Sequence, residues 1–473
     1  MIDDLWRKGS DELAAMIAGK EVSSTEVVQA HLDRIAAVNP QLNAITTLLA
    51  ESALEAAADA DRTTAGGGAL GPLHGVPITV KQNIDLVGSA TNQGMVALAD
   101  ALPTADSPVA ERMKAAGAIP IGRTNCPDMG LRLHTDSGLF GLTRNPWHPD
   151  RTTGGSSGGE GSALASGMSP LGLGNDIGGS LRNPATCCGI ASIKPTQSSV
   201  PFFTSIPVPD SGFGSQTMLS EGPMARRIGD VRTALGILAG RDPRDPNSIP
   251  VVPPAPRPTD RPIRVAVLAE PPGSTTDPRV AGVVRGAGDA LVAAGYDVFD
   301  ATPPRFEEIW SVWLGLLMAD LFPVAELLLP MLSDDARTFL TLGADFVTPL
   351  DLSAMLQTAM ARQSLMRDWA MWFAGTADVL LTPTWTELPF EHGFDISSPE
   401  ASASITVMAR SVLPGNLLGI PSVCVPAGLV GGLPVGVLVN ADRHRDDLAL
   451  DVAEAIEAAC GLDTPIDPWR AED

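Results

Sequence analysis

The sequence has few basic residues and few cysteines. Its 473 residues include 32 Lys and Arg against 55 Asp and Glu, which gives a formal net charge of -23. Nucleic-acid binding needs clustered basic side chains, so this deficit argues against a nucleic-acid partner. The five cysteines are odd in number and contain no Cys-x-x-Cys pair. They therefore argue against a zinc or redox centre and favour reduced, buried thiols.

The sequence also lacks a long uninterrupted apolar run. A membrane-spanning helix needs about 20 nearly uncharged residues. The most apolar window, residues 309–332, is interrupted by acidic residues and prolines: Asp320, Pro323, Glu326 and Pro330. Residues 1–19 carry several acidic side chains and no apolar core of the kind found in secretory signals. We therefore expect a cytoplasmic protein with no membrane span.

Strand-like and helix-like segments alternate along the whole sequence, and 44% of the residues are hydrophobic. One buried-strand pattern ends near Lys81, and others lie at 119–121, 263–269, 296–301, 377–385 and 422–440. Helical patterns follow a capping box at 23–26 and recur at 54–61, 109–116, 162–167, 281–294 and 446–459. This alternation predicts a single α/β layered domain over residues 1–473.

Two segments depart from the alternation. Residues 241–262 are rich in Pro and Asp, which predicts a surface linker within the domain. Residues 307–375 are mainly helical in pattern, and we expect them to form an insert over the active-site side. The insert and its end hold most of the tryptophans, which could line an apolar channel, pack as ordinary helices or form a dimer face: Trp310, Trp313, Trp369, Trp372 and Trp385.

The stretch from Thr152 to Gly189 is unusually rich in glycine and serine. Apolar residues are interleaved with its glycines, which a flexible linker does not need. No lysine occurs between Thr152 and Ile193, so the stretch is not a Walker phosphate loop. The dinucleotide pattern Gly-x-Gly-x-x-Gly begins at Gly172 but has Ile177 in its last position. Both phosphate-binding interpretations are therefore weak.

Two interpretations as a serine hydrolase remain. Gly154-x-Ser156-x-Gly158 fits a nucleophile elbow, but that motif needs an acid and then a histidine downstream. The histidines beyond Ser156 are His392 and His444, and neither lies in a recognisable motif. The nucleophile elbow stays open as an alternative, although a base other than histidine accounts better for the residues.

In the other interpretation a lysine is the base. Ser156 and Ser180 each follow a Gly-Gly pair, where the backbone can approach a substrate closely. The amides of residues 177–180 could bind a developing oxyanion. A serine hydroxyl needs a base, and a lysine can serve when burial lowers its pKa. Lys81 ends an apolar segment and is the candidate, unless its side chain reaches solvent at the strand end.

Four motifs in order resemble the amidase signature family of serine hydrolases. They are GPLHGVPITVKQNID, AIPIGRTNCPDMG, the stretch from GGSSGGEGS to ASIKPT, and NLLGIPSVCVPAGLVGGLPVGVLV. The resemblance covers most of the chain. It implies a large mixed β-sheet core flanked by helices on both faces, with the helical insert near the active site. It also implies catalysis without a metal or cofactor.

The resemblance further implies a role for individual residues. Ser180 matches the nucleophile, Lys81 the general base, and Ser156 a bridging serine whose peptide bond is cis in the family. The implied oxyanion hole consists of the backbone amides of Ile177, Gly178, Gly179 and Ser180. The residues expected to support the site are Ser157, Asp176 and Arg182. The expected substrate pocket is lined by Met129, Gly130, Leu131, Trp313 and Leu317.

The substrate expectation rests on one substitution and on the insert. Ile177 stands where the glutamine-hydrolysing subunit of amidotransferases usually has threonine before Gly-Gly-Ser, and an apolar residue suits a less polar acyl group. We expect a stand-alone amidase that cleaves bulky, apolar amides or anilides, with carbamates (urethanes) as further candidates. The alternatives are the glutamine-hydrolysing subunit of an amidotransferase, or an inactive family member that acts as a binding module. A homodimer is also considered.

Overall fold

The core of the computed structural model is one mixed β-sheet, and the structure describes residues 2–206, 210–344 and 349–469. Its 11 strands lie in the order β1-β3-β2-β6-β8-β7-β12-β13-β11-β9-β10. The strand bounds are β1 Ile45–Leu48, β2 Pro77–Lys81, β3 Ile119–Thr124, β6 Leu171–Asp176, β7 Ala191–Lys194, β8 Ser220–Ala225, β9 Arg264–Val267, β10 Asp297–Asp300, β11 Val379–Pro383, β12 Ser422–Val430 and β13 Leu433–Ala441. A separate two-stranded sheet pairs β4 Asp136–Ser137 with β5 Gly141–Leu142.

Parallel and antiparallel pairs both occur in the large sheet. Strand β2 runs parallel to β3 and β6, and β9 runs parallel to β10 and β11. The strands between these groups are antiparallel, including the long hairpin β12–β13. Every strand expected from the sequence is present, which confirms the mixed α/β sheet.

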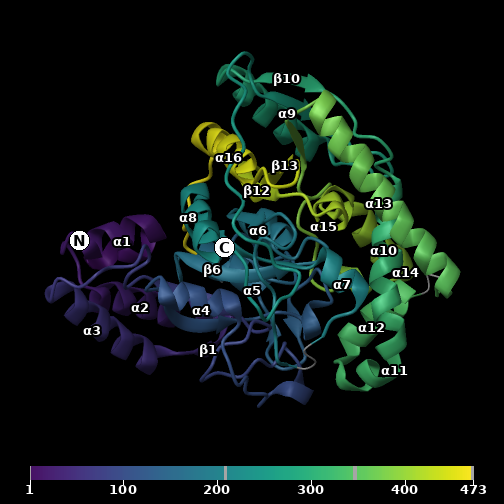
Figure 1. The fold of residues 1–473 in the computed structure, drawn as a ribbon. Coiled ribbons are helices and arrows are strands. Elements are labelled where there is room, and N and C mark those ends of the chain that lie inside the picture. Colours follow the sequence, from purple (N-terminus) through teal and green to yellow (C-terminus); the bar gives the residue numbers. More distant parts are fainter. Residues whose placement is uncertain (1, 207–209, 345–348, 470–473) are drawn as a thin grey trace.

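Helices cover both faces of this sheet (Figure 1). Their bounds are α1 Ser10–Ala18, α2 Ser24–Leu42, α3 Ala50–Ala65, α4 Pro108–Ala115, α5 Gly158–Ala165, α6 Arg182–Cys188, α7 Phe213–Met218, α8 Ile228–Leu238, α9 Pro278–Ala293, α10 Glu308–Leu321, α11 Ala325–Leu328, α12 Asp334–Ala344, α13 Leu352–Gly375, α14 Pro399–Met408, α15 Leu413–Leu418 and α16 Asp446–Cys460. One apolar cluster packs α1, α4, α8, α9 and α16 against the sheet. A second cluster packs α5, α6, α10, α13 and α15.

Side-chain alternation along the strands assigns the two faces. In β11, Val379 and Leu381 belong to the first cluster, whereas Leu380 belongs to the second. In β2, Ile78 and Val80 belong to the first cluster. Because successive strand residues point to opposite faces, Lys81 begins on the face that α5 and α6 cover.

Helix α5 begins four residues earlier than the pattern at 162–167 predicts. Its first turn contains Gly158 and Gly159, which have low helix propensity. A Cβ on Gly159 would stand 2.5 Å from the backbone oxygen of Asn125, so only glycine fits beside that strand end. Close backbone packing therefore overrides propensity at this helix start.

The expected insert contains α10 to α13, which lie along one side of the molecule, far from α1 to α3 (Figure 1). Residues 345–348 of the insert are outside the described residues. Residues 241–262 contain no helix or strand, and the structure describes all of them. By length and composition alone, Glu308–Met331 could cross a membrane, and 28% of its apolar window is buried. Short 3₁₀ turns at Pro323 and Pro330 interrupt that run.

Candidate active site

The candidate site lies at the carboxyl ends of β2 and β6, which are parallel neighbours. Lys81 is the last residue of β2 and is 0% exposed. Its Nζ lies 2.7 Å from Ser156 Oγ and 2.8 Å from Asn175 Oδ1 near the end of β6. The expected base therefore does not reach solvent. In open α/β sheets, ligands bind at such strand ends.

Burial lowers the pKa of Lys81 to about 8, because the charged amine loses its hydration. Four acidic groups act in the opposite direction and limit the shift: Cys126, Asp176, Glu160 and Glu221. Burial also raises the pKa of Glu221 well above its ordinary value, so this neighbour adds little negative charge near neutral pH. Burial thus shifts the balance toward the uncharged amine, which is the form that can accept a proton, while the ammonium still predominates below pH 8.

Ser156 and Ser180 lie on segments that the backbone holds side by side. The Gly155–Ser156 peptide bond is cis, as the resemblance implies. The amide of Ser157 donates to the carbonyl of Ser180 at 3.2 Å, and the amide of Gly155 donates to Asn183 Oδ1 at 2.9 Å. Both serine side chains are nearly buried, with 2% of Ser156 and 5% of Ser180 exposed. The structure thus joins Lys81 directly to Ser156 and holds the segment of Ser180 beside that of Ser156 through the backbone.

Asp176 braces the turn that carries Ser180. Its carboxylate accepts from the amides of Gly179 at 2.8 Å and Leu181 at 3.0 Å. It also receives two hydrogen bonds from Arg182, at 2.7 and 2.9 Å. Burial alone would raise the pKa of Asp176, but the Arg182 guanidinium and these hydrogen bonds hold it well below its ordinary value. Both residues are 0% exposed, so this is a fully buried ion pair.

The brace engages one of the amides expected to form the oxyanion hole. The resemblance implies that the amide of Gly179 faces the oxyanion, but here it donates to Asp176 Oδ1. The physical reason is local, because an aspartate three residues earlier closes the turn on that amide. Within the described residues, the amides of Ile177, Gly178 and Ser180 have no hydrogen-bond acceptor. These three remain the candidates for binding an oxyanion.

The expected pocket residues fall into two groups around the site. Gly130 lies directly beside Ser156, because a Cβ on Gly130 would stand 3.0 Å from Ser156 Oγ. Its neighbours Met129 and Leu131 pack against an apolar cluster from the insert. That cluster includes Leu321, Leu328, Leu329, Met331, Leu332 and Leu340.

Trp313 and Leu317 both lie on α10, and of the two Trp313 contacts the turn before Ser180, whereas Leu317 packs against the second apolar cluster. The indole Nε1 of Trp313 donates to the carbonyl of Ile177 at 2.8 Å. A Cβ on Gly178 would stand 2.6 Å from the Trp313 ring. Other insert tryptophans have a different role: Trp369 is 1% exposed and packs against aromatic neighbours in the core. The tryptophan group is therefore partly core and partly site wall.

Sequence reasoning missed several polar residues of the site. Asn175 bonds Lys81 and exchanges hydrogen bonds with Asn83, and no motif argument singles out either residue. Asn416 looks architectural in the sequence, yet its amide donates to Asp176 Oδ1 and its Oδ1 accepts from Arg182. The signal for Asn175 is its place next to Asp176 at a strand end, where polar side chains gather.

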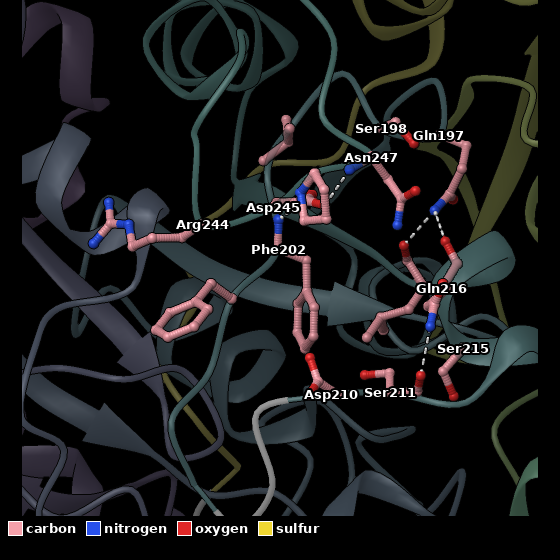
Figure 2. A pocket seen from close by; sticks show the side chains of 14 residues that line it. Gln197, Ser198, Phe202, Asp210, Ser211, Ser215, Gln216, Arg244, Asp245 and Asn247 are labelled. Carbon is pink, nitrogen blue, oxygen red and sulfur yellow. Dashed lines mark hydrogen bonds between the residues drawn. The ribbon is translucent and has the colours of Figure 1, made fainter.

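A separate pocket of about 130 Å³ contains none of the expected site residues (Figure 2). It lies between the segments 197–203, 210–219 and 244–247. Its labelled side chains come largely from loops, and several of them bond one another. Among the described residues, no group of three His, Cys, Asp or Glu side chains is placed to hold a metal ion.

Comparisons with known proteins agree with one another. A profile of the amidase family matches residues 26–450. An indoleacetamide hydrolase of Bradyrhizobium diazoefficiens is 40% identical over 459 residues, which cover 97% of this chain and 87% of that protein. A glutamyl-tRNA(Gln) amidotransferase subunit of Acidothermus cellulolyticus is 34% identical over 491 residues, covering 97% and 95%. A bacterial aryl acylamidase of the amidase signature family superposes with a TM-score of 0.81 at 26% identity, covering 97% of both chains.

Proposed function

The chain belongs to the amidase signature family and is a hydrolase acting on C–N bonds of amides, and on that premise we propose that it cleaves bulky, apolar amides and anilides through a Lys81–Ser156–Ser180 relay. The single observation that carries this proposal is the buried contact of 2.7 Å between Lys81 Nζ and Ser156 Oγ. A buried lysine beside a hydroxyl can act as a base, since burial lowers its pKa and makes the uncharged form more accessible.

The proposed reaction proceeds in two halves. Neutral Lys81 accepts the hydroxyl proton of Ser156, and Ser156 accepts that of Ser180. Ser180 Oγ forms a bond to the carbonyl carbon, and the carbonyl electron pair moves to oxygen, which faces the free amides of residues 177, 178 and 180. The C–N bond then breaks as the proton returns through Ser156 to the leaving nitrogen. Water cleaves the resulting acyl-enzyme by the same relay and restores Ser180.

The preference for apolar substrates rests on the walls of the site. Met129 and Leu131 flank Gly130, which lies beside Ser156, and they belong to an apolar cluster with the leucines of the insert, while Trp313 bonds the turn before Ser180. Hydrophobic and aromatic linings are typical of pockets for apolar ligands. Two relatives are named for amides that carry an aromatic group, indoleacetamide hydrolase and aryl acylamidase. Carbamates are included in the proposal because they undergo the same attack at a carbonyl.

Glutamine hydrolysis within an amidotransferase is the second candidate, since the amidotransferase subunit of Acidothermus matches nearly the whole chain. A panel of nitroanilide, carbamate and glutamine substrates separates the two. Turnover of anilides supports the proposal, whereas glutaminase activity without anilide turnover supports the second candidate. If neither class turns over and a fluorophosphonate does not label Ser180, the chain is a binding module.

Two substitutions test the roles of the relay residues. Ser180→Ala should abolish turnover and labelling, and Ser156→Ala should lower the rate by about 10³-fold or more, because the proton then has no path to Lys81. Ser166→Ala is a matched control, since Ser166 Oγ bonds carbonyl oxygens of its own helix. A fully active Ser156→Ala variant would refute the relay.

A further inference from the structure

Glu160 is a buried carboxyl that the relay does not use. It lies in the first turn of α5, four residues after Ser156, and is 0% exposed. Its Oε2 forms a hydrogen bond with Thr79 Oγ1 at 2.6 Å, and its Oε1 forms one with Thr124 Oγ1 at 2.9 Å. One side chain thus joins α5 to both β2 and β3.

The two threonines are immediate neighbours of Lys81 in the sheet. Thr79 precedes Lys81 by two residues on β2, so both side chains start on the same face. Thr124 is the register partner of Lys81 on β3. Ser156, which contacts Lys81, lies on the segment that leads into α5. Glu160 therefore connects the two parts of the chain that meet in the Lys81–Ser156 contact.

The neighbouring strand leaves space for this carboxyl. Gly172 of β6 is the register partner of Thr79. A Cβ on Gly172 would stand 2.6 Å from Cδ of Glu160 and 3.1 Å from Thr79 Oγ1. The backbone of Gly172 does not have a positive φ, so the position needs glycine for space and not for conformation. The close approach shows that the carboxyl is seated on the sheet beside β2.

We propose that Glu160 is a positioning residue, which holds Lys81 against Ser156 by bonding β2 and β3 to α5 through an uncharged carboxyl. The inference rests on the proposed function, because it gives Glu160 a role in the geometry of the relay. An uncharged carboxyl can donate to one threonine and accept from the other, which satisfies both oxygens in a buried place.

The charges around Glu160 are consistent with the uncharged form. Burial raises its pKa to about 8, although the two threonine bonds and the cations Lys81 and Arg123 act to lower it. Lys81 also faces Cys126, Asp176 and Glu221. If Glu160 were ionised near neutral pH, its charge would favour the protonated form of Lys81 and so oppose the relay.

The rate at which a fluorophosphonate labels Ser180, measured as a function of pH, tests the inference without knowledge of the substrate. Glu160→Ala and Gly172→Ala should each slow labelling by about tenfold or more, because small misplacements of reacting groups are costly. Glu160→Gln should label within about threefold of the wild type near neutral pH, since an uncharged amide reproduces both bonds. Gly282→Ala, where a Cβ meets nothing within 4 Å, is the control for glycine replacement.

Each outcome decides the matter. Labelling of Glu160→Ala or Gly172→Ala at the wild-type rate overturns the positioning role. Labelling of Glu160→Gln that is more than about threefold faster than the wild type near neutral pH overturns the uncharged form, because it shows that a negative charge next to Lys81 was removed. If Glu160→Ala does not fold, Thr79→Val and Thr124→Val take its place with the same expectation. If the wild type is not labelled, the proposed function itself is refuted. If the wild type and every variant are labelled at the same rate, only the positioning role of Glu160 is refuted.

Discussion

Replacement of Lys81 by methionine should abolish the reaction and, at neutral pH, stabilise the fold. Methionine has a similar length and no charge, so it fills the same buried volume. The wild-type protein must either bury an ammonium or release its proton on folding, because Lys81 is 0% exposed. Both choices cost free energy at pH 7, and methionine removes that cost.

The magnitude follows from the pKa of Lys81. Burial lowers it from 10.5 to about 8. Between these values the unfolded chain binds more protons than the folded one, so stability rises with pH across that window. Below pH 8 the full penalty, about 3 kcal/mol, is present, and above pH 10.5 it has disappeared. Loss of the hydrogen bonds to Ser156 and Asn175 costs about 1 kcal/mol each at every pH. The Lys81→Met variant should therefore be more stable than wild type by about 1 kcal/mol at pH 7 and less stable by about 2 kcal/mol above pH 10.5.

Thermal unfolding at a series of pH values between 7 and 10.5 measures this crossover. Lys194→Met is the matched control, because Lys194 is a second fully buried lysine whose pKa burial lowers to about 7. That variant should also gain stability at neutral pH, yet keep fluorophosphonate labelling of Ser180 within about threefold. If Lys81→Met is less stable than wild type at pH 7 by the same amount as at pH 10.5, Lys81 carries no charge penalty and the reasoning fails.

Three further predictions concern the relay and its walls. Labelling of Ser180 in the wild type should rise with pH through a midpoint near 8 and fall about tenfold per pH unit below it, since neutral Lys81 is the base; a midpoint near 10.5 in the pH–rate series would contradict this. Asp176→Asn leaves Arg182 buried without its counter-charge and should lower kcat by about 100-fold in steady-state kinetics. A kcat equal to that of the wild type would show that the brace is dispensable. Trp313→Phe removes the bond to the Ile177 carbonyl and should lower kcat/KM about three- to tenfold for every amide. Trp313→Ala should in addition raise KM more for bulky anilides than for small amides. Equal changes of KM for both substrate types would exclude Trp313 from the pocket.

Seven of the 11 strands of the large sheet were predictable because they are short apolar runs bounded by turn residues, whereas β1, β6, β7 and β8 were not expected. The hairpin around Gly431 and Gly432 illustrates this, since both glycines have positive φ and the flanking runs pair antiparallel. The order of the strands was not predictable. Strand β6 lies between β2 and β8 although β3 follows β2 in the chain, and no local pattern specifies such crossovers. Helix α5 begins earlier than expected because backbone packing selects glycine where propensity disfavours it.

Lys81, Ser156 and Ser180 can be found in the sequence because glycine pairs and an apolar strand mark them. The polar residues that surround them carry no such mark. Asn175 and Lys81 are separated by 94 residues in the chain, so their hydrogen bond depends on the pairing of β2 with β6. The hydrogen bond from the Gly179 amide to Asp176 was not expected for a related reason. The backbone amides of a turn can face a ligand, but a side chain of the same turn can accept a hydrogen bond from one of them, and the sequence does not reveal which amide is engaged.

The buried polar network also explains why the site can combine an uncharged base with a rigid nucleophile. Lys81 must be buried away from water for its pKa to fall, but burial also costs free energy for the polar groups that hold it in place. The sheet resolves the conflict by pairing polar groups with one another: Asn175 with Lys81, and Asp176 with Arg182. Arg182 neutralises the Asp176 carboxylate within the pair that braces the Ser180 turn, although Asp176 still acts to raise the pKa of Lys81. Without a paired cation, this carboxylate would favour the protonated lysine more strongly, so we expect Arg182 to support catalysis as well as folding.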